Sequence, residues 1–195
     1  MDLSAKTYRL SISCLLALCF GIAPSMAAEL KDPLSPLNKT KDAFLCFRRD
    51  YAADHLAKHP KQTTKSIVVT FQGNGYVTIA LQPRSGAENR IGAGCEWRQG
   101  AGIDTSDRKM IPNFNKSAGF DCITTVGDTA EEGGYGLIDP AQDGKSMTVF
   151  LQSPIYVEPK GGKGHHLDLG VEDRTFILNR VDAKTCQDYR PVVNE

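Results

Sequence analysis

Ser66–Phe71 (SIVVTF) and Tyr76–Leu81 (YVTIAL) are the stretches of sequence that decide the fold. Both are rich in β-branched and aromatic residues, which pack well on a pleated sheet and favour strands. Between them stands Gln72-Gly73-Asn74-Gly75, and glycine and asparagine are the residues that tight turns require. The pattern predicts an antiparallel β-hairpin.

Strand-like segments continue along the rest of the chain. We expect further strands at Ala93–Arg98, Phe120–Val126, Gly134–Ile138, Ser146–Gln152, His166–Leu169 and Arg174–Arg180. Short strands separated by turn residues favour a mainly β fold, either a single antiparallel β-sandwich or a small β-barrel of about seven or eight strands. A parallel α/β sheet is excluded because the long helices that would alternate with its strands are missing from the pattern.

One short N-terminal helix is expected within Ala43–Pro60. Asp50 is a plausible N-cap, and Pro60 ends the helix because proline cannot continue it. Two stretches, Gly100–Lys116 and Pro154–Gly164, are long and irregular. Loops of this kind on a β scaffold often carry function.

The first 28 residues have the pattern of a secretory signal peptide. Lys6 and Arg9 precede an apolar run from Leu10 to Ala23, and Ser25-Met26-Ala27 fits a small-residue cleavage site. The apolar run is too short to cross a bilayer, and we expect no membrane span in the mature chain. The domain organisation that follows is a signal peptide at 1–28, an extended lead-in at 29–42 and a single β-rich domain at 43–195. We expect a periplasmic or secreted protein.

Cleavage would leave four of the six cysteines in the mature chain: Cys46, Cys95, Cys122 and Cys186. An even number of cysteines in an exported chain indicates two disulfides, for which three connectivities are possible. We favour Cys46–Cys186, which would join the two ends of the domain, and Cys95–Cys122, which would join neighbouring strand-like segments.

The charge balance argues against a nucleic-acid partner. Lys and Arg total 23 and Asp and Glu total 23, so the formal net charge is zero. Phosphate binding requires a clear basic excess, which this chain lacks. We therefore expect no nucleic acid among its partners.

The histidines are the candidate metal ligands. His55 and His59 lie four residues apart in the expected helix, so both imidazoles could face one ion, and His165-His166 could supply another ligand. Leu56 stands where a zinc peptidase of this helix pattern has its glutamate base. Solvated surface histidines are the alternative reading.

The segment Lys160-Gly161-Gly162-Lys163-Gly164-His165-His166 is cationic and rich in glycine. Its candidate binding residues are Lys160, Lys163, His165 and His166, which could meet an anionic partner. A solvated connection between strands is the alternative.

Motifs for catalysis and cofactor binding are incomplete. Ser106-Asp107-Arg108-Lys109 matches the bare Ser-x-x-Lys of penicillin-recognising enzymes, but the companion motifs are missing. Gly144-Lys145-Ser146 resembles part of a phosphate loop, but Asp139 stands where that loop requires glycine. We expect no catalytic residues of these classes and no cofactor.

The signal peptide, paired cysteines and β-rich core look broadly similar to those of small exported bacterial proteins, including periplasmic inhibitors of lysozyme. The similarity concerns architecture, and no inhibitor motif carries over. The sequence favours a non-enzymatic binding protein of the cell envelope, with an envelope protein or polymer as its partner. The alternatives are a small periplasmic hydrolase, pairing His55 or His166 with an acid from 128–132, or a metal-binding protein that uses His55, His59, His165 and His166.

Overall fold

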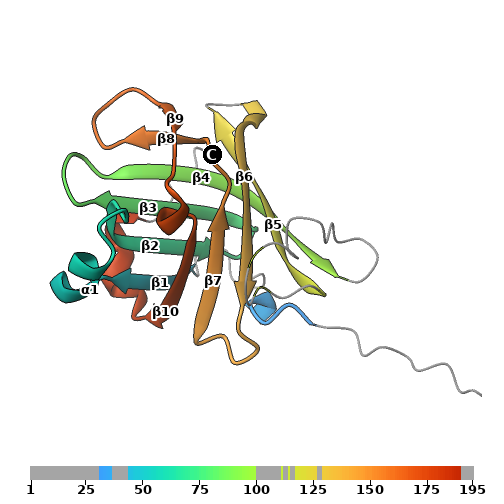
Figure 1. The fold of residues 1–195 in the computed structure, drawn as a ribbon. Helices are drawn as coiled ribbons and strands as arrows, with labels where there is room; N and C mark the ends of the chain where they lie inside the picture. Colours follow the sequence, from blue (N-terminus) through green and yellow to red (C-terminus); the bar gives the residue numbers. More distant parts are fainter. Residues whose placement is uncertain are drawn as a thin grey trace, which may run out of the picture.

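A computed structural model describes residues 31–36, 44–99, 111, 114, 117–126 and 129–189, with the side chains of 129–132 left out. The predicted signal peptide at 1–28 and most of the long segment 100–116 lie outside the described residues. The described chain forms ten strands, one α-helix and two short 3-10 helices, shown in Figure 1. In chain order they are β1 (Phe44–Asp50), α1 (Ala53–Lys58), β2 (Thr64–Gln72), β3 (Tyr76–Pro83), β4 (Asn89–Gln99), β5 (Ala118–Val126), β6 (Thr129–Pro140), β7 (Ser146–Leu151), β8 (Ile155–Pro159), β9 (His165–Leu167), η3 (Val171–Asp173), β10 (Thr175–Val181) and η4 (Ala183–Tyr189).

Eight of these strands close into an antiparallel barrel. Their order is β3-β2-β1-β10-β7-β6-β5-β4, and β3 pairs with β4 to complete the ring. The remaining two, β8 and β9, form a hairpin that joins the sheet where β8 pairs with Asn89 and Arg90 of β4. The structure confirms the mainly β fold and selects the barrel over the sandwich.

The interior of the barrel is filled by apolar side chains. Strand residues alternate between the two faces of a sheet, so every second residue points inward. Phe47, Phe71 and Phe176 are almost completely buried there, and they belong to one cluster that draws on strands all around the ring. An eight-stranded barrel is just wide enough for side chains to fill or to hold one small ligand. The packed interior directs attention to the outer surface as the place for binding.

Both predicted disulfides are present. Cys95 and Cys122 lie directly opposite each other on β4 and β5, and their bridge joins the interior cluster. The Cys46–Cys186 bridge lies on the outer face of the barrel, where Cys186 of η4 packs with Val68 and Ala80. This second bridge fastens η4 over β1 and β2.

The hairpin that decides the fold forms as predicted. β2 and β3 pair from Phe71↔Val77 to Thr64↔Pro83. Gly75 has a φ of 81°, a left-handed conformation that glycine adopts without strain. The side chain of Asn74 accepts a hydrogen bond from the backbone N–H of Tyr76 at 3.0 Å. Turn chemistry and strand composition therefore agree in this segment.

Two strands were not expected from the sequence. Phe44–Asp50 forms β1 and precedes the helix, so Asp50 ends a strand and Ala52, not Asp50, is the N-cap of α1. Ile155–Pro159 forms β8 within a stretch that was expected to be irregular. β1 forms because β2 and the distant β10 pair with it, and β8 forms by pairing with the adjacent β9 and the distant β4, so in both cases pairing outweighs a weak local signal.

Two further segments pack against the barrel. Residues 31–36, which fall in the expected lead-in, form a turn that places Leu34 in the interior cluster. The carboxylate of Asp32 accepts a hydrogen bond from the backbone N–H of Leu34 at 2.7 Å. Ile111 and Phe114, the two described residues of the long irregular segment, lie near its C-terminal end and pack with Leu137 in a separate cluster.

Candidate functional site

A groove of about 410 Å³ lies where β1 and β10 separate, and we call it the seam groove. Its lining comes from the end of β1, from α1, from η3 and from the start of β10. The lining residues are Arg49, Tyr51, His55, His59, Gln62, Val171, Glu172, Thr175 and Ile177. The groove therefore brings together residues from the first and last strands of the barrel.

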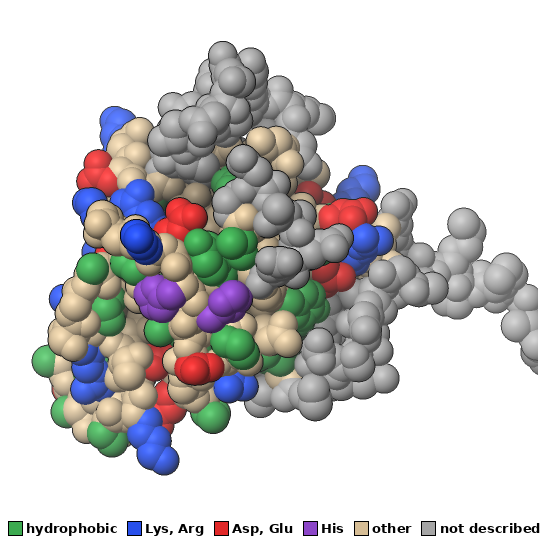
Figure 2. All heavy atoms as spheres, turned by 90° about the horizontal axis from the view of Figure 1, so that it is seen from above, with side chains coloured by type: hydrophobic (Ala, Val, Ile, Leu, Met, Phe, Trp, Pro, Cys, Tyr) green, Lys and Arg blue, Asp and Glu red, His purple; other side chains and the backbone are tan. Residues whose placement is uncertain are grey.

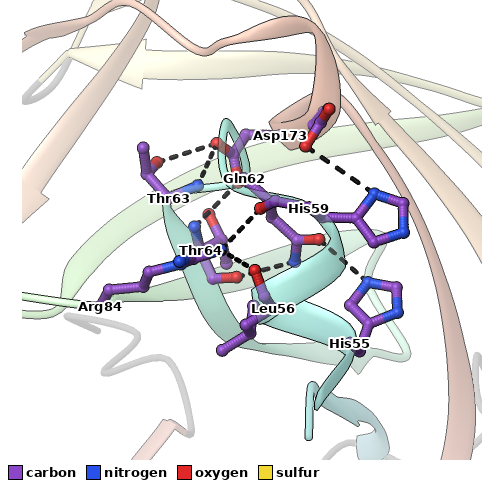
Figure 3. A network of polar contacts seen from close by, with 9 residues as sticks. His55, Leu56, His59, Gln62, Thr63, Thr64, Arg84 and Asp173 are labelled. Atoms are coloured by element: carbon purple, nitrogen blue, oxygen red, sulfur yellow. Dashed lines mark hydrogen bonds and ion pairs between the residues drawn. The ribbon is translucent and has the colours of Figure 1, made fainter. Parts of the chain in front are cut away.

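Helix α1 is only six residues long, and contacts at its C-terminal end hold it in place. The guanidinium of Arg84 donates hydrogen bonds to the carbonyl oxygens of Leu56 and His59 at 2.8 and 2.6 Å. The same carbonyls accept from the backbone N–H groups of His59 and Gln62 at 3.3 and 3.1 Å, so Arg84 adds a second donor to each. Arg84 thus fixes the helix against the end of β3, as Figure 3 shows.

Gln62 connects His55 to the start of β2. The buried Gln62 side chain donates from Nε2 to the carbonyl oxygen of Thr64 at 2.8 Å. Its Oε1 lies 3.1 Å from His55 Nε2. An amide oxygen can only accept, so the proton of His55 is on Nε2 in this contact. The orientation of His55 in the groove is therefore set by a buried partner.

Asp173 attaches η3 to the same region. Its carboxylate is completely buried and accepts hydrogen bonds from the backbone N–H groups of Thr63 and Thr64 at 2.7 and 2.9 Å. The hydroxyl of Thr63 donates a third bond at 2.8 Å. Three donors satisfy a buried charge that would otherwise be costly. Asp173 therefore holds Val171 and Glu172 at the opposite wall of the groove.

Aromatic rings form the wall beneath α1. The ring of His55 stacks between Tyr51 and His59, with centroid distances of 4.8 and 4.3 Å. The guanidinium of Arg49 lies 5.5 Å from the centroid of the Tyr51 ring. Burial raises the pKa of the Tyr51 phenol, and the charge of Arg49 acts in the opposite direction. This wall is aromatic and carries positive charge at one end.

His59 also faces an acid across the groove. Its Nδ1 lies 3.8 Å from Oε2 of Glu172, an ion-pair distance when the imidazole is protonated. This separation is too long for a hydrogen bond. Figure 3 shows His59 and His55 side by side at the edge of the polar network.

The structure brings together the two helical histidines but not all four. His165 and His166 lie on β9, and no group of three or more His, Cys, Asp or Glu side chains able to hold a metal was found among the described residues. The stacked rings of His55 and His59 and the Gln62 contact of His55 differ from two imidazoles directed at one ion. The metal-binding alternative stays a prediction.

Of the candidate binding residues of the cationic segment, Lys160 and Lys163 lie in the loop of the β8–β9 hairpin, and His165 and His166 begin β9. Lys160, Lys163, His165 and His166 are exposed. The backbone N–H of Lys160 donates to the carbonyl oxygen of Glu88 at 2.8 Å, which ties the base of the loop to the barrel. The rings of Tyr156 and His166 meet edge to face with centroids 5.6 Å apart. In Figure 1 the hairpin extends beyond the ring of barrel strands.

The described part of the face seen in Figure 2 carries mixed charges. In Figure 2, which views the molecule from above, basic, acidic and hydrophobic side chains are interspersed over the described atoms, and two histidines lie among them.

No helix in the described part of the chain is long and apolar enough to cross a membrane. Side chains of the acidic residues 128, 131 and 132, which were candidate partners of a catalytic histidine, lie outside the described residues.

The fold and sites define a small disulfide-bonded protein with a packed antiparallel barrel. Comparisons of the chain with protein-family models, with curated proteins and with solved structures found no match. Sequence reasoning identified His55 and His59 but missed the groove residues Glu172, Val171 and Ile177. Strand alternation between inward Phe176 and outward Ile177 is the signal that could have indicated an exposed apolar residue there.

Proposed function

We propose that this chain is an exported, non-enzymatic binding protein of the cell envelope. The observation that carries the proposal is the β8–β9 hairpin, whose loop presents two exposed lysines away from a barrel with a packed interior. Neither Lys160 nor Lys163 forms an ion pair with any residue that the structure describes. Both charges are thus available to an anionic envelope protein or polymer.

The hairpin also has the local order that a binding loop needs. The N–H of Gly162 donates to the carbonyl oxygen of Pro159 at 2.9 Å, and Gly161 adopts a φ of 76°. These features define a turn between β8 and β9, so the two lysines are held near one another in a short loop. A preformed loop loses less conformational entropy on binding than a flexible one.

The proposed site of action is the periplasm or the outside of the cell. Two disulfides join four cysteines of the β domain, and such bridges persist in oxidising compartments. Mass spectrometry of the protein from its native host should find a mature N-terminus at Ala28 or Glu29. A full-length chain in the cytoplasm would contradict export.

The binding proposal is tested by affinity capture from envelope extract with the oxidised mature protein. We expect Lys160→Gln/Lys163→Gln to capture much less of the partner than the unmodified protein, at one fixed ionic strength because salt screens exposed charges. Lys65→Gln/Lys184→Gln is the matched control, since it removes two exposed lysines elsewhere. Equal capture by both double variants would contradict a role for the hairpin.

One contact favours the hydrolase alternative. His59 and Glu172 face each other in the seam groove, and a carboxylate beside one imidazole nitrogen can orient the other as a base. The hydroxyl groups that line the groove belong to Tyr51 and Thr175. A hydrolase of this kind would lose its activity in His59→Gln, whereas the binding function of the hairpin would be unchanged.

A further inference from the structure

The seam groove has a feature that the hairpin does not share, an incomplete ladder between two strands. β1 and β10 pair at three positions, from Cys46↔Val181 to Arg48↔Asn179. Beyond that point β1 continues along β2 as far as Asp50↔Ser66, and β10 continues along β7 as far as Thr175↔Phe150. In Figure 1 the two strands run in clearly different directions. The groove residues Arg49, Thr175 and Ile177 all lie beyond the last pair of the ladder, Arg48↔Asn179.

The backbone groups of β10 at this divergence point toward the groove. In an antiparallel strand, each residue directs its N–H and C=O to one side, and consecutive residues alternate. The N–H of Arg180 donates to the carbonyl oxygen of Lys145, just before β7, and the carbonyl oxygen of Arg174 accepts from Leu151 of β7. The even-numbered residues of β10 therefore direct their backbone groups toward β7. Thr175 and Ile177 therefore direct their backbone groups to the opposite side, where the ladder with β1 has ended.

The side chains around this edge provide two kinds of contact. Val171 and Ile177 are 85% and 62% exposed, and both line the groove, so they offer apolar surface. On the opposite wall Arg49 forms no ion pair with the described residues and lies over the Tyr51 ring. Its charge favours an acidic side chain at this end of the groove, whereas the acidic Glu172 lines the other wall beside His59.

The apolar contact and the charged contact lie on opposite faces of the sheet, as successive side chains of a strand do. Ile177 follows the inward-pointing Phe176 and so points outward, whereas Arg49 has the same parity in β1 as the inward-pointing Phe47. A strand added beside β10 would present alternate side chains to these two environments. An aliphatic residue next to an acidic residue fits this pattern.

We propose that the seam groove binds an extended peptide segment, with alternating aliphatic and acidic side chains, as an added strand along Thr175–Ile177 of β10. Main-chain hydrogen bonds to an exposed strand edge supply affinity in this mode of recognition, and alternate side chains supply specificity. A groove of about 410 Å³ has the size of a site for a short segment. This site is separate from the cationic hairpin, so the two proposals can fail independently.

The test is nuclear magnetic resonance titration of the oxidised mature protein with an acetylated, amidated peptide of alternating valine and aspartate. We expect saturable shifts of the Thr175 and Ile177 amide signals. A peptide methylated at alternate backbone nitrogens keeps its side chains but loses donors, and we expect about tenfold weaker binding, the effect of a lost hydrogen bond.

Matched variants assign the contacts. Ile177→Thr should weaken binding, whereas Ile123→Thr, at another exposed isoleucine, should not. Arg49→Gln should remove the preference for aspartate over asparagine in the peptide, while Lys65→Gln and Lys160→Gln/Lys163→Gln should keep it. Because Ile177 and Arg49 are exposed, these changes leave the core intact, and a melting curve checks folding.

Three results would overturn the proposal. The first is a titration in which neither Thr175 nor Ile177 shifts, and the second is equal binding of the methylated peptide. The third is a protein that is dimeric in solution and becomes monomeric in Ile177→Thr, because the occupant of the edge would then be a second copy of the chain. Loss of envelope capture in the hairpin variant has no bearing on any of these results.

Discussion

Asp173 and Thr63, which are 110 residues apart in sequence, are joined twice: both the backbone N–H and the hydroxyl of Thr63 donate to Oδ2 of the buried carboxylate, at 2.7 and 2.8 Å. The second carboxylate oxygen accepts from the N–H of Thr64. This contact connects η3, which carries the groove residues Val171 and Glu172, to the start of β2.

Replacement of Asp173 should destabilise the protein strongly. Asp173→Ala leaves the backbone N–H groups of Thr63 and the buried Thr64 without their acceptor, and we expect a loss of about 3 kcal/mol in the free energy of unfolding. Urea denaturation measures it, with the exposed Asp188→Asn as the control. A loss as small as that of the control would mean that water replaces the carboxylate.

Removal of the two disulfides should have unequal effects. In the chain-entropy model the stabilisation grows with loop length, and the bridges span 140 and 27 residues. We expect Cys46→Ala/Cys186→Ala to cost up to about 5 kcal/mol and Cys95→Ala/Cys122→Ala up to about 3.5 kcal/mol. Denaturant unfolding without reductant compares the two. The opposite order would show that the interior bridge contributes through packing.

Gly75→Ala should be more harmful than Gly86→Ala. Both glycines have a positive φ, at 81° and 93°, so an alanine is strained at either position. A Cβ at Gly75 would also lie 2.6 Å from the carbonyl oxygen of Cys95, whereas a Cβ at Gly86 would meet nothing within 4 Å. We expect about 1 kcal/mol at Gly86 and about 2–3 kcal/mol at Gly75, by thermal unfolding. Equal losses would mean that β4 shifts without cost.

Ionisation of the Tyr51 phenol should reduce the stability of the folded protein at alkaline pH. Burial raises the pKa of its phenol above the ordinary value of 10.0, so the folded protein holds the proton more tightly than the unfolded chain does. Below that pH both states are protonated and the group has no effect on the pH dependence. As the pH rises through the unfolded value, the unfolded chain ionises first and stability falls.

The measurement is the free energy of unfolding of Tyr51→Phe across this pH range. The variant should lose less stability than the unmodified protein between neutral and alkaline pH. Parallel curves for the two proteins would show that Tyr51 ionises equally easily in both states.

The two groove histidines should differ in their effect on stability. His55→Ala leaves the buried Oε1 of Gln62 without its partner, and we expect a loss of about 1 kcal/mol. His59→Ala removes a more exposed ring and should change stability by less than about 0.5 kcal/mol. Denaturation at neutral pH compares them. Stoichiometric zinc that is lost in either variant would favour the metal-binding alternative instead.

The strands predicted from sequence were those in which composition and turn chemistry agree. SIVVTF, YVTIAL and the glycine-asparagine turn between them carry their own signal, and the structure confirms the hairpin. Phe44–Asp50 carries Arg48, Arg49 and Asp50, so nothing local distinguishes it from the start of a helix. It becomes a strand because β2 and β10 pair with it on either side.

The seam groove was less accessible to prediction for a related reason. His55 and His59 form a local pattern, but Glu172 and Ile177 reach them through a contact between segments more than a hundred residues apart, and no short motif records that contact. The disulfides were predictable because four cysteines have only three possible pairings, and the signal-peptide pattern predicts an oxidising compartment in which cysteines pair.

The place of β10 in the ring has a consequence for how the chain folds. β10 lies between β1 and β7. Of the described strands β1 is synthesised first and β10 last, so β1 pairs only with β2 until β10 has been synthesised. Contacts between such distant segments form slowly, because closing the long loop costs entropy before the contact contributes any stabilisation. Until Thr175–Val181 arrives, both β1 and β7 present open edges, which invite pairing with other chains. A fragment that stops before β10 should therefore aggregate rather than form a smaller barrel, because two of its strand edges stay open.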